Sequence, residues 1–476
     1  MPRRRPSLVL ASILALPLAV TPAARAAAAP PAFTVEPLYD IEPTGAPWFF
    51  PVCPIPIPEC PPGQGAYVRQ MTTFGDLAVF TAFDFDHGEE VWVTDGTPQG
   101  THPLIDLCPG DCWSLPRILG TVGGKLLFHA YGPPLSGGYR LWATDGLEVH
   151  AVGVEEIDPW VVSPKAIDGW LYFGHAYSVW RSDGVVLQLA AEFTGGVYII
   201  EQILDLGSRA FILRDGRSGW LDELREIGPS TPEVLRACSP SDGFSRFVVL
   251  GDAAYFSARC VAGLPDLGPG LFRTDGSPGG TARVKTFDQG PPGYYFLPAA
   301  AEFFFLAASP GGVVIWRSDG TAAGTVPVSG PLAPPVRLLL LLGNRSLLFE
   351  TTDHIRALDL TTGVVADLPI AYSAEAIAHP SGSFGLIGNS TGWWITSGTP
   401  ETTFQVFTSD PQGWAPPLTA AFLRDRAVFS GDDGVHGEDI WVLGLPNALA
   451  IPALGWPGVV LLALLLAAAA VRALRR

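Results

Sequence analysis

A short motif that recurs along the chain constrains its fold more than any other feature. Its fullest copy, Glu90–Thr97, is an apolar strand around Trp92 that ends in a Thr-Asp-Gly turn. Further copies keep the strand and the Asp-Gly turn: Leu141–Gly146, Val179–Gly184, Leu271–Gly276 and Ile315–Thr321. Self-similarity at a regular period is typical of repeat architectures, in which neighbouring units together bury a continuous core.

The repeat contains more than the tryptophan strand. An apolar strand around a phenylalanine precedes it, as in Leu77–Ala82, and an outer strand follows, as in Thr101–Leu107. A weaker strand, Pro116–Leu119, leads into the next repeat and makes a fourth. The phenylalanine positions are Phe80, Phe128, Phe173, Phe211, Phe256, Phe305, Phe349, Leu386 and Phe429. The tryptophan positions are Trp92, Trp142, Trp180, Leu221, Phe272, Trp316, Arg356, Trp394 and Trp441.

This spacing predicts an all-β fold. Trp92 to Trp441 covers 349 residues in eight steps, or about 44 residues per repeat, which is typical of a propeller blade. We therefore predict a β-propeller of about nine four-stranded blades over residues 27–446. Eight blades remain an alternative, because four repeats are degraded and propellers usually contain about 4–8 blades.

The N-terminal part of this region predicts how the ring closes. Phe33–Ile41 resembles the outer strand Thr101–Leu107, yet no tryptophan strand precedes it. The last repeat stops at Gly444, before any outer strand. The N-terminal strand is therefore predicted to complete the last blade, which leaves no open sheet edge at the junction.

These motifs resemble the ELWxxDGT repeat family of bacterial exported proteins. Glu90–Thr97 matches it with Val91 in place of Leu, and Leu271–Thr281 and Ile315–Thr325 also keep its later Gly-Thr. The resemblance covers roughly residues 66–445. It implies a repeat-built surface or secreted protein, in a family whose members mostly have no assigned activity.

The two ends predict where the protein works. Residues 1–26 look like a signal peptide, because Arg3–Arg5 are followed by an apolar stretch and Ala24-Arg25-Ala26 offers a cleavage site. Residues 447–476 contain an uncharged run, Ile451–Val471, long enough for one transmembrane helix and followed by arginines that favour the cytoplasmic side. An exported protein at the cell envelope is therefore expected.

The C-terminal segment also resembles the IPTL-type sorting signals of bacteria. It has an Ile-Pro-x-Leu start, an apolar helix and a basic tail, with Ala453 where that family usually has Thr. The resemblance implies a sorting protease as a partner and a mature protein without this segment. A permanent membrane anchor is the alternative.

Charge excludes one class of partner. The whole chain has a net charge of −17, and loss of the four leader and three C-terminal arginines leaves −24. Phosphate backbones require a basic surface, so nucleic acid is not an expected partner.

The six cysteines fit an oxidising compartment, where an even number favours disulfides. We expect the local pairs Cys53–Cys60, Cys108–Cys112 and Cys238–Cys260, although six cysteines allow 15 connectivities. Zinc is the alternative for Cys108 and Cys112, because their four-residue spacing falls within the range of zinc ligands.

Two kinds of acidic residue are candidate metal ligands. The Asp-Gly aspartates are expected to cap their own turns rather than bind cations. The acidic hairpins carry Asp84, Asp86, Asp432 and Asp433, whose oxygens make a calcium site a candidate. Neither hairpin has EF-hand spacing, so a solvated acidic hairpin is the alternative.

The sequence does not identify catalytic residues or an organic cofactor. Neither a His-Glu-x-x-His pair nor a phosphate-binding loop occurs in it. We therefore expect a surface-associated binding module for an envelope protein or glycan. The alternative is a secreted enzyme that acts on polysaccharide, with calcium as its possible cofactor; acidic residues clustered with Arg or Tyr at the channel mouth favour this alternative.

Overall fold

The computed structural model describes most of the predicted propeller. It covers residues 33–41, 66–109, 113–132, 138–154, 156–157, 161–175, 177–193, 199–215, 221–228, 232–239, 243–264, 268–277, 279–293, 295–409, 418–434 and 437–445. These residues form nine antiparallel sheets of four strands each. The all-β propeller of nine blades is confirmed, and the eight-blade alternative is wrong.

Blades are numbered in chain order, and the strands of each blade are given from the centre outwards. Blade 1 contains β2 (Arg69–Phe74), β3 (Leu77–Asp84), β4 (Gly88–Thr94) and β5 (His102–Ile105). Blade 2 contains β6 (Arg117–Val122), β7 (Lys125–Gly132), β8 (Gly138–Thr144) and β9 (Val149–Ala151). Blade 3 contains β10 (Val161–Ile167), β11 (Trp170–His175), β12 (Ser178–Ser182) and β13 (Leu187–Glu192). Blade 4 contains β14 (Ile199–Leu206), β15 (Arg209–Asp215), β16 (Glu223–Glu226) and β17 (Glu233–Arg236). Blade 5 contains β18 (Val248–Leu250), β19 (Ala253–Ala258), β20 (Gly270–Thr274) and β21 (Ala282–Thr286). Blade 6 contains β22 (Phe296–Pro298), β23 (Phe303–Ser309), β24 (Gly312–Ser318) and β25 (Val326–Pro327).

The last three blades follow the same order. Blade 7 contains β26 (Arg337–Leu342), β27 (Ser346–Glu350), β28 (Ile355–Asp359) and β29 (Val365–Asp367). Blade 8 contains β30 (Glu375–Ala378), β31 (Gly385–Asn389), β32 (Gly392–Thr396) and β33 (Thr403–Thr408), with the 3-10 helix η2 (Pro400–Thr402) before β33. Blade 9 contains β34 (Ala420–Phe422), β35 (Arg426–Asp432), β36 (Glu438–Gly444) and β1 (Thr34–Tyr39).

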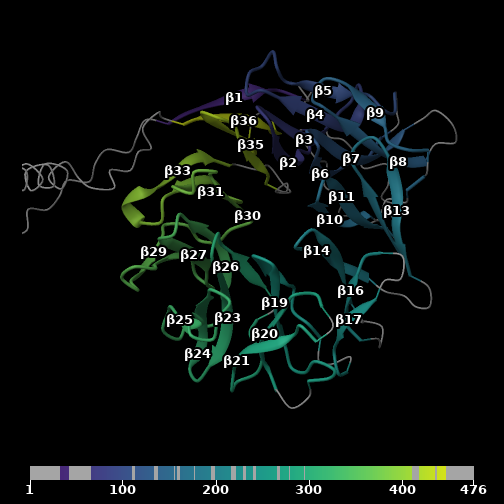
Figure 1. Ribbon diagram of the computed structural model, residues 1–476. Coiled ribbons are helices and arrows are strands. Elements are labelled where there is room, and N and C mark those ends of the chain that lie inside the picture. The colour runs from purple at the N-terminus through teal and green to yellow at the C-terminus, as the bar shows by residue number, and fades with distance from the viewer. Residues whose placement is uncertain are drawn as a thin grey trace, which may run out of the picture. The chain divides into compact units, whose positions relative to one another are not determined.

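The first strand of each blade lies nearest the centre. These strands approach one another in chain order, with β2 beside β6, β6 beside β10, and β10 beside β14. Figure 1 shows the sheets following one another around a common centre. Because the inner strands line that centre, their side chains are the ones that a channel-bound molecule would meet.

The ring closes through the N-terminal strand, as the sequence predicts. β1 pairs with β36 from Thr34 opposite Gly444 to Tyr39 opposite Ile440, and β2 of the first blade lies beside β34 of the last. Blade 9 is therefore built from both ends of the described chain, and β1 covers the edge that β36 would otherwise expose.

The tryptophans of the motif pack between blades. Trp142 of blade 2 lies in a buried cluster with Val79 and Val91 of blade 1. Trp92 of blade 1 lies in a cluster with Leu423 and Val428 of blade 9. The large apolar side chain of each repeat thus covers the face of the preceding sheet, which is why single blades depend on their neighbours.

The Thr-Asp-Gly turn is explained by its own hydrogen bonds. In blade 1, Asp95 Oδ1 accepts from the main-chain N of Thr97 at 2.8 Å, and Thr94 Oγ1 accepts from the N of Gly96 at 2.9 Å. The Thr94 hydroxyl also lies 2.7 Å from that of Thr101, both buried. The same turn bond from aspartate recurs at Asp145, Asp183, Asp275 and Asp319, so capping of the turn, as expected, is confirmed.

The glycine of the turn also lies against the preceding blade. Gly320 has a φ of +88°, and a Cβ at this position would lie 2.1 Å from the hydroxyl of Tyr255 in blade 5. Gly276 of blade 5 meets Phe211 of blade 4 in the same way, at 2.5 Å. The Asp-Gly pair therefore reverses the chain and permits close packing between sheets.

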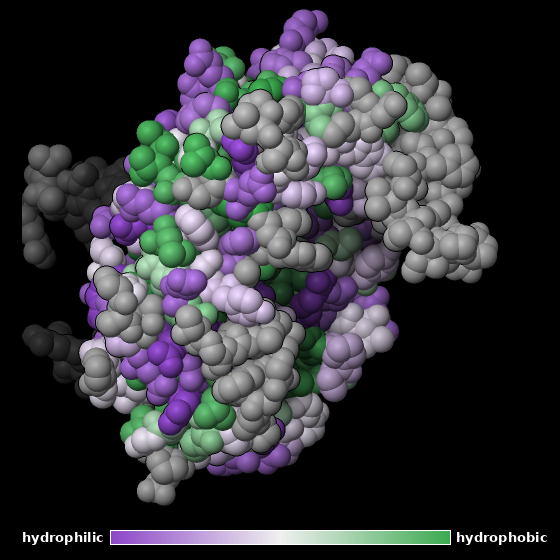
Figure 2. All heavy atoms as spheres, turned by 90° about the vertical axis from the view of Figure 1, so that its right-hand side faces the viewer, coloured by the Kyte–Doolittle hydropathy of each residue, from purple (hydrophilic) through white to green (hydrophobic). Residues whose placement is uncertain are grey.

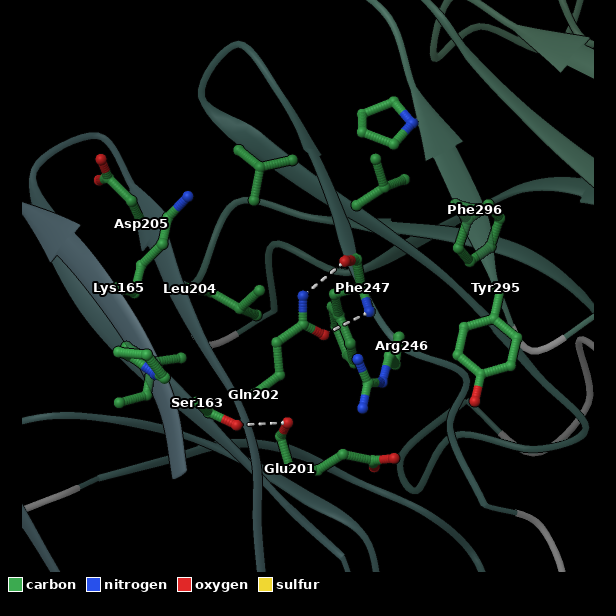
Figure 3. Close-up of a pocket in the computed structure, with 15 residues that line it drawn as sticks. Ser163, Lys165, Glu201, Gln202, Leu204, Asp205, Arg246, Phe247, Tyr295 and Phe296 are labelled. Carbon is green, nitrogen blue, oxygen red and sulfur yellow. Dashed lines mark hydrogen bonds between the residues drawn. The ribbon is translucent and has the colours of Figure 1, made fainter. Parts of the chain in front are cut away.

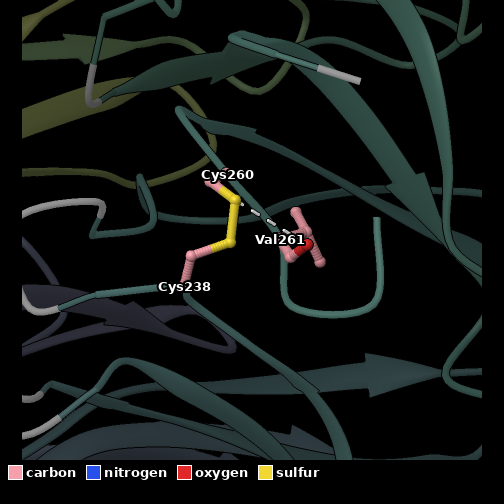
Figure 4. Close-up of a disulfide and its surroundings, with 3 residues drawn as sticks. All are labelled: Cys238, Cys260 and Val261. Carbon is pink, nitrogen blue, oxygen red and sulfur yellow. Dashed lines mark hydrogen bonds between the residues drawn. A yellow bond between two sulfur atoms is a disulfide. The ribbon is translucent and has the colours of Figure 1, made fainter. Parts of the chain in front are cut away.

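One expected disulfide is confirmed and links two blades. Cys238 follows β17 of blade 4 and bonds to Cys260, which follows β19 of blade 5, with their Cα atoms 5.6 Å apart (Figure 4). Cys108 is also disulfide-bonded. Cys53, Cys60 and Cys112 lie outside the described residues, so the other two expected pairings stay predictions.

One position assigned to the tryptophan strands lies outside its strand. Leu221, expected in the third strand of the fourth repeat, precedes β16 (Glu223–Glu226), and Phe211 pairs with Glu226. The fourth repeat lacks the Asp-Gly turn that follows this strand elsewhere, so its sequence does not mark where the strand ends. The blade nevertheless forms a complete four-stranded sheet.

The predicted transmembrane helix lies outside the described residues. Among the residues that the structure does describe, no helix is long and apolar enough to cross a membrane. The side of the ring that carries β9 and β13 mixes hydrophobic and hydrophilic residues (Figure 2). Such mixing is ordinary for a protein surface and does not mark a binding site.

Candidate functional site

A cavity of about 500 Å³ lies on the channel wall, formed by the inner strands of four consecutive blades. Ser163 and Lys165 come from β10, Glu201, Gln202 and Asp205 from β14, Arg246–Val249 from β18 and the residues before it, and Tyr295, Phe296 and Pro298 from β22 and the residue before it. Figure 3 shows these side chains arranged around one space. We call this wall the channel groove.

A side-chain amide fixes the centre of the channel groove. Gln202 Nε2 donates to the main-chain O of Phe247, and the main-chain N of Phe247 donates to Gln202 Oε1, both at 2.8 Å (Figure 3). Blades 4 and 5 are thereby joined at the channel wall, and both main-chain polar groups of Phe247 already have partners.

A second hydrogen bond fixes the side of the groove nearer blade 3. Ser163 Oγ donates to the main-chain O of Glu201 at 2.8 Å. Ser163 has a φ of +52°, and it lies within the register shift between Val162 and Lys165. β14 also has a register shift, between Ile200 and Gln202. At these bulges the side chains no longer alternate regularly between the two faces of the sheet.

Two cations of the channel groove, Lys165 and Arg246, have no carboxylate partner in the described part of the chain. Lys125 and Lys285, which do not line the groove, donate to the main-chain oxygens of Gly184 and Thr325 in the next blades. Lys165 is exposed and makes no such bond among the described residues. The guanidinium of Arg246, also exposed, lies 5.7 Å from the ring centroid of Tyr295. Both cations are therefore available to a ligand in the groove.

Tyr295 adds an aromatic surface to these charges. Its side chain is 66% exposed, although large aromatic rings usually bury most of their area. A ring that is exposed inside a recess and has a cation beside it can stack against a ligand.

A smaller cavity of about 300 Å³ continues the groove along the same wall. It shares Lys165, Asp205 and Val249 with the larger cavity. It also reaches the turns at Gly207–Ser208 and Gly251–Asp252, where inner strands end. The recess therefore runs lengthwise along the inner strands rather than forming a round pit.

A second group of polar side chains lies where blades 9 and 1 meet. Arg69 Nη2 lies 2.5 Å from Glu89 Oε1, and the guanidinium of Arg69 lies 4.0 Å from the centroid of the Tyr67 ring. The main-chain N of Val68 donates to the Glu438 carboxylate, whose Oε1 has no partner among the described residues. Tyr67, Arg69, Glu89 and Glu438 are called the junction cluster.

Burial raises the pKa values of the junction carboxyls. It raises the pKa of Glu89, against the lowering effect of Arg69. It raises the pKa of Glu438 well above the ordinary range, with a further contribution from Asp439. The Arg69 side chain is 34% exposed whereas that of Glu89 is 4% exposed, so solvent reaches the cluster from the arginine side.

Glu89 and Glu438 are each followed in the sequence by a second acidic residue, Glu90 and Asp439, which has a structural role. Glu90 Oε2 accepts from Ser114 Oγ at 2.7 Å, and the equivalent Asp439 Oδ1 accepts from the main-chain N of Ile41 at 3.1 Å. Ser114 and Ile41 both lie in the chain that leaves an outer strand. The acid of the repeat motif therefore holds the connection between an outer strand and the next part of the ring.

The calcium candidates lie at equivalent points in adjacent blades. Asp84 ends β3 and accepts from His87, at 2.6 Å from the main-chain N and 2.8 Å from Nδ1. Asp432 ends β35 and accepts from the main-chain N of Gly434 at 2.8 Å. Asp86 and Asp433 lie in the hairpin loops between these strands and the next. Within the described ranges no three or more His, Cys, Asp and Glu are grouped to hold a metal, and calcium binding stays a prediction.

The residues of the channel groove were not predicted from the sequence. They lie on inner strands, whereas the recurring motif marks the third strand of each blade. The one sequence signal that could have indicated them is variation between the repeats, because Lys165, Arg246 and Tyr295 belong to no repeated pattern.

No protein-family model matches this chain, and no curated protein matches it. Among solved structures, the computationally designed Ika8 protein is 12% identical with a TM-score of 0.42, covering 80% of this chain and 97% of that one. An oligogalacturonate lyase in complex with manganese is 12% identical with a TM-score of 0.41, covering 78% and 97%. BamB from Moraxella catarrhalis is 13% identical with a TM-score of 0.42, covering 69% and 96%. Identities and TM-scores this low do not identify a function.

Proposed function

We propose that this chain is an exported, surface-associated β-propeller that binds an envelope component through the channel groove. The observation that carries this proposal is the groove itself, in which Lys165, Arg246 and Tyr295 are exposed on a wall of fixed inner strands. Concave recesses with a few convergent polar groups are the usual place for ligands.

The two ends of the sequence support the cellular location. Residues 1–26 have the charge and hydrophobicity of a signal peptide, and Ile451–Val471 is long enough to cross a bilayer. The C-terminal segment then either anchors the propeller permanently or is removed by a sorting protease. In both cases the propeller lies outside the cytoplasm, where the Cys238–Cys260 disulfide persists.

Loss of both groove cations is expected to weaken envelope binding. Full-length protein with Lys165→Ala and Arg246→Ala should bind isolated envelope fragments at least about tenfold more weakly than wild type, because each lost charged contact contributes roughly 1.5–3 kcal/mol. Biolayer interferometry on immobilised fragments measures this difference. Arg317→Ala is the matched control, because Arg317 is exposed outside the groove. Equal binding by the double variant and wild type would exclude the groove as the binding site.

A second candidate function is cleavage of polysaccharide, favoured by the junction cluster. Burial raises the pKa of Glu438 well above its ordinary range, which favours its protonated form, whereas Glu89 is paired with Arg69. Glycoside cleavage requires one carboxyl group that donates a proton and a second that acts as nucleophile or base. Calcium at Asp84, Asp86, Asp432 or Asp433 would then lie in the same two blades.

This second candidate predicts a specific loss of activity. If the chain releases reducing ends from a panel of plant and microbial polysaccharides, Glu438→Gln should lower the rate at least about 100-fold, as expected for loss of a general acid. The substitution keeps the size and neutral charge of the protonated acid. Glu401→Gln, on an exposed turn of blade 8, should leave the rate unchanged. Full activity in Glu438→Gln would exclude this mechanism.

A further inference from the structure

The shape and chemistry of the channel groove narrow the class of ligand. We propose that the groove binds a neutral oligosaccharide chain, which lies along the inner strands and stacks one sugar ring on Tyr295. This inference rests on the proposed function and adds the ligand class to it.

The first argument is the length of the recess. The two cavities, of about 500 and 300 Å³, share Lys165, Asp205 and Val249. Together they follow the wall from Arg246 and Tyr295 to the turn at Gly251–Asp252. A linear ligand of several similar units fits such a recess better than a compact one does.

The second argument is the aromatic platform. Tyr295 is 66% exposed, and the Arg246 guanidinium lies 5.7 Å from its ring centroid. In Figure 3 the Tyr295 ring and the Arg246 guanidinium face the same space. The apolar C–H face of a sugar ring can cover an exposed aromatic ring, while a neighbouring guanidinium donates to hydroxyls at its edge.

The third argument is the balance of charge. Lys165 and Arg246 share the groove with Glu201, Asp205 and Asp252. A strongly anionic ligand would meet three carboxyl groups, and a strongly cationic one would meet two cations. Hydroxyl groups donate and accept hydrogen bonds, so a neutral sugar can use side chains of both signs along the groove.

The fourth argument is against an extended peptide. A peptide that adds a strand to a sheet needs free main-chain N–H and C=O groups along the edge. Gln202 already occupies both groups of Phe247, and Ser163 occupies the O of Glu201. The register shifts in β10 and β14 interrupt the regular edge as well.

Titration of full-length protein with neutral oligosaccharides tests this inference. The probes are linear β-1,4-linked glucose, xylose, mannose and N-acetylglucosamine chains of about four to six units, measured by isothermal titration calorimetry up to about 5 mM. We expect at least one probe to bind with a Kd below about 1 mM. Tyr295→Ala should weaken its binding at least about tenfold, and Tyr295→Phe should change it less than about threefold, because the ring is retained.

Controls separate this inference from the function on which it rests. Tyr177→Ala removes an exposed tyrosine outside the groove and should leave binding unchanged, and equal melting temperatures show that the variants fold. Absence of binding by every neutral probe, or binding unaffected by Tyr295→Ala, overturns the inference. Binding of only uronic acid oligosaccharides or only extended peptides also overturns it, yet leaves a groove-binding function in place. Envelope binding that survives Lys165→Ala with Arg246→Ala overturns the proposed function itself.

Discussion

The free energy of unfolding is expected to fall as the pH rises from about 4 to about 8. Burial raises the pKa of both Glu90 and Asp439 to about 8, and it raises the pKa of Glu438 well above its ordinary range. For Asp439 the hydrogen bond from Ile41 acts in the opposite direction, and the neighbouring Asp40 adds to the rise. Asp439 and Glu438 lie at the junction at which the ring closes, and Glu90 holds the connection between blades 1 and 2.

The sign follows from the protons that each state binds. An unfolded carboxyl releases its proton near pH 4, whereas folded Glu90 and Asp439 keep theirs until about pH 8. Between these values the folded state binds more protons, so raising the pH favours unfolding by up to about 1.4 kcal/mol per pH unit for each group. The turn carboxyls Asp95 and Asp275 have lowered pKa values, mainly from the Thr97 and Ser277 hydroxyls, so their stabilisation is lost at low pH instead.

Urea unfolding followed by tryptophan fluorescence from pH 4 to 9 measures this dependence. Asp439→Asn keeps an oxygen that accepts from Ile41 but cannot ionise, so its slope should be shallower by about 1.4 kcal/mol per pH unit, and it should be more stable than wild type at pH 8. Asp95→Asn is the control, because it removes an acid whose pKa is lowered. A wild-type profile that is flat between pH 5 and 8 would contradict the prediction.

Gly320→Ala is expected to lower the free energy of unfolding by about 2–4 kcal/mol. The alanine would keep a φ of +88°, and its Cβ would lie 2.1 Å from Tyr255 Oη and 2.7 Å from the carbon that carries this hydroxyl. The Tyr255 ring is buried and packs 5.1 Å from Phe303, centroid to centroid. The ring therefore cannot move aside without disturbing the core between blades 5 and 6.

Gly75→Ala separates strain from contact in the same denaturation experiment. Gly75 has a φ of +60°, and a Cβ at this position would meet nothing within 4 Å, so only the backbone strain of about 1–2 kcal/mol applies. The excess loss in Gly320→Ala then measures the contact between blades. Equal losses at the two positions would show that the close approach of Gly320 to Tyr255 contributes nothing.

The fold could be predicted because its strongest sequence signals have local causes. Trp92 and Trp142 are needed to cover a neighbouring sheet, and the Asp95-Gly96 turn satisfies its own hydrogen bonds, so both recur wherever a blade recurs. The prediction was less accurate in blade 4, whose third strand is Glu223–Glu226 and does not include Leu221, because the Asp-Gly turn that marks the strand end is absent there.

The site could not be predicted for a related reason. The channel groove is assembled from inner strands of four blades. Its chemistry depends on residues such as Arg246 and Tyr295, which the other repeats do not share. Their proximity depends on how blades 5 and 6 are placed around the ring. The junction cluster combines acidic residues with an arginine and a tyrosine, as the enzyme alternative expects, but its members come from the first and last blades, which are far apart in the sequence.

Completion of blade 9 by β1 has a consequence for biosynthesis. Ile41 and Asp439, which hydrogen-bond at the end of this strand, are 398 residues apart. An elongating chain cannot form that contact until nearly all of the propeller has been made, and such distant pairing is slow to form. A chain that terminates before β36 would leave β1 without its partner strand. Ring closure therefore acts as a check on full-length synthesis, because only a complete chain can cover its last open edge.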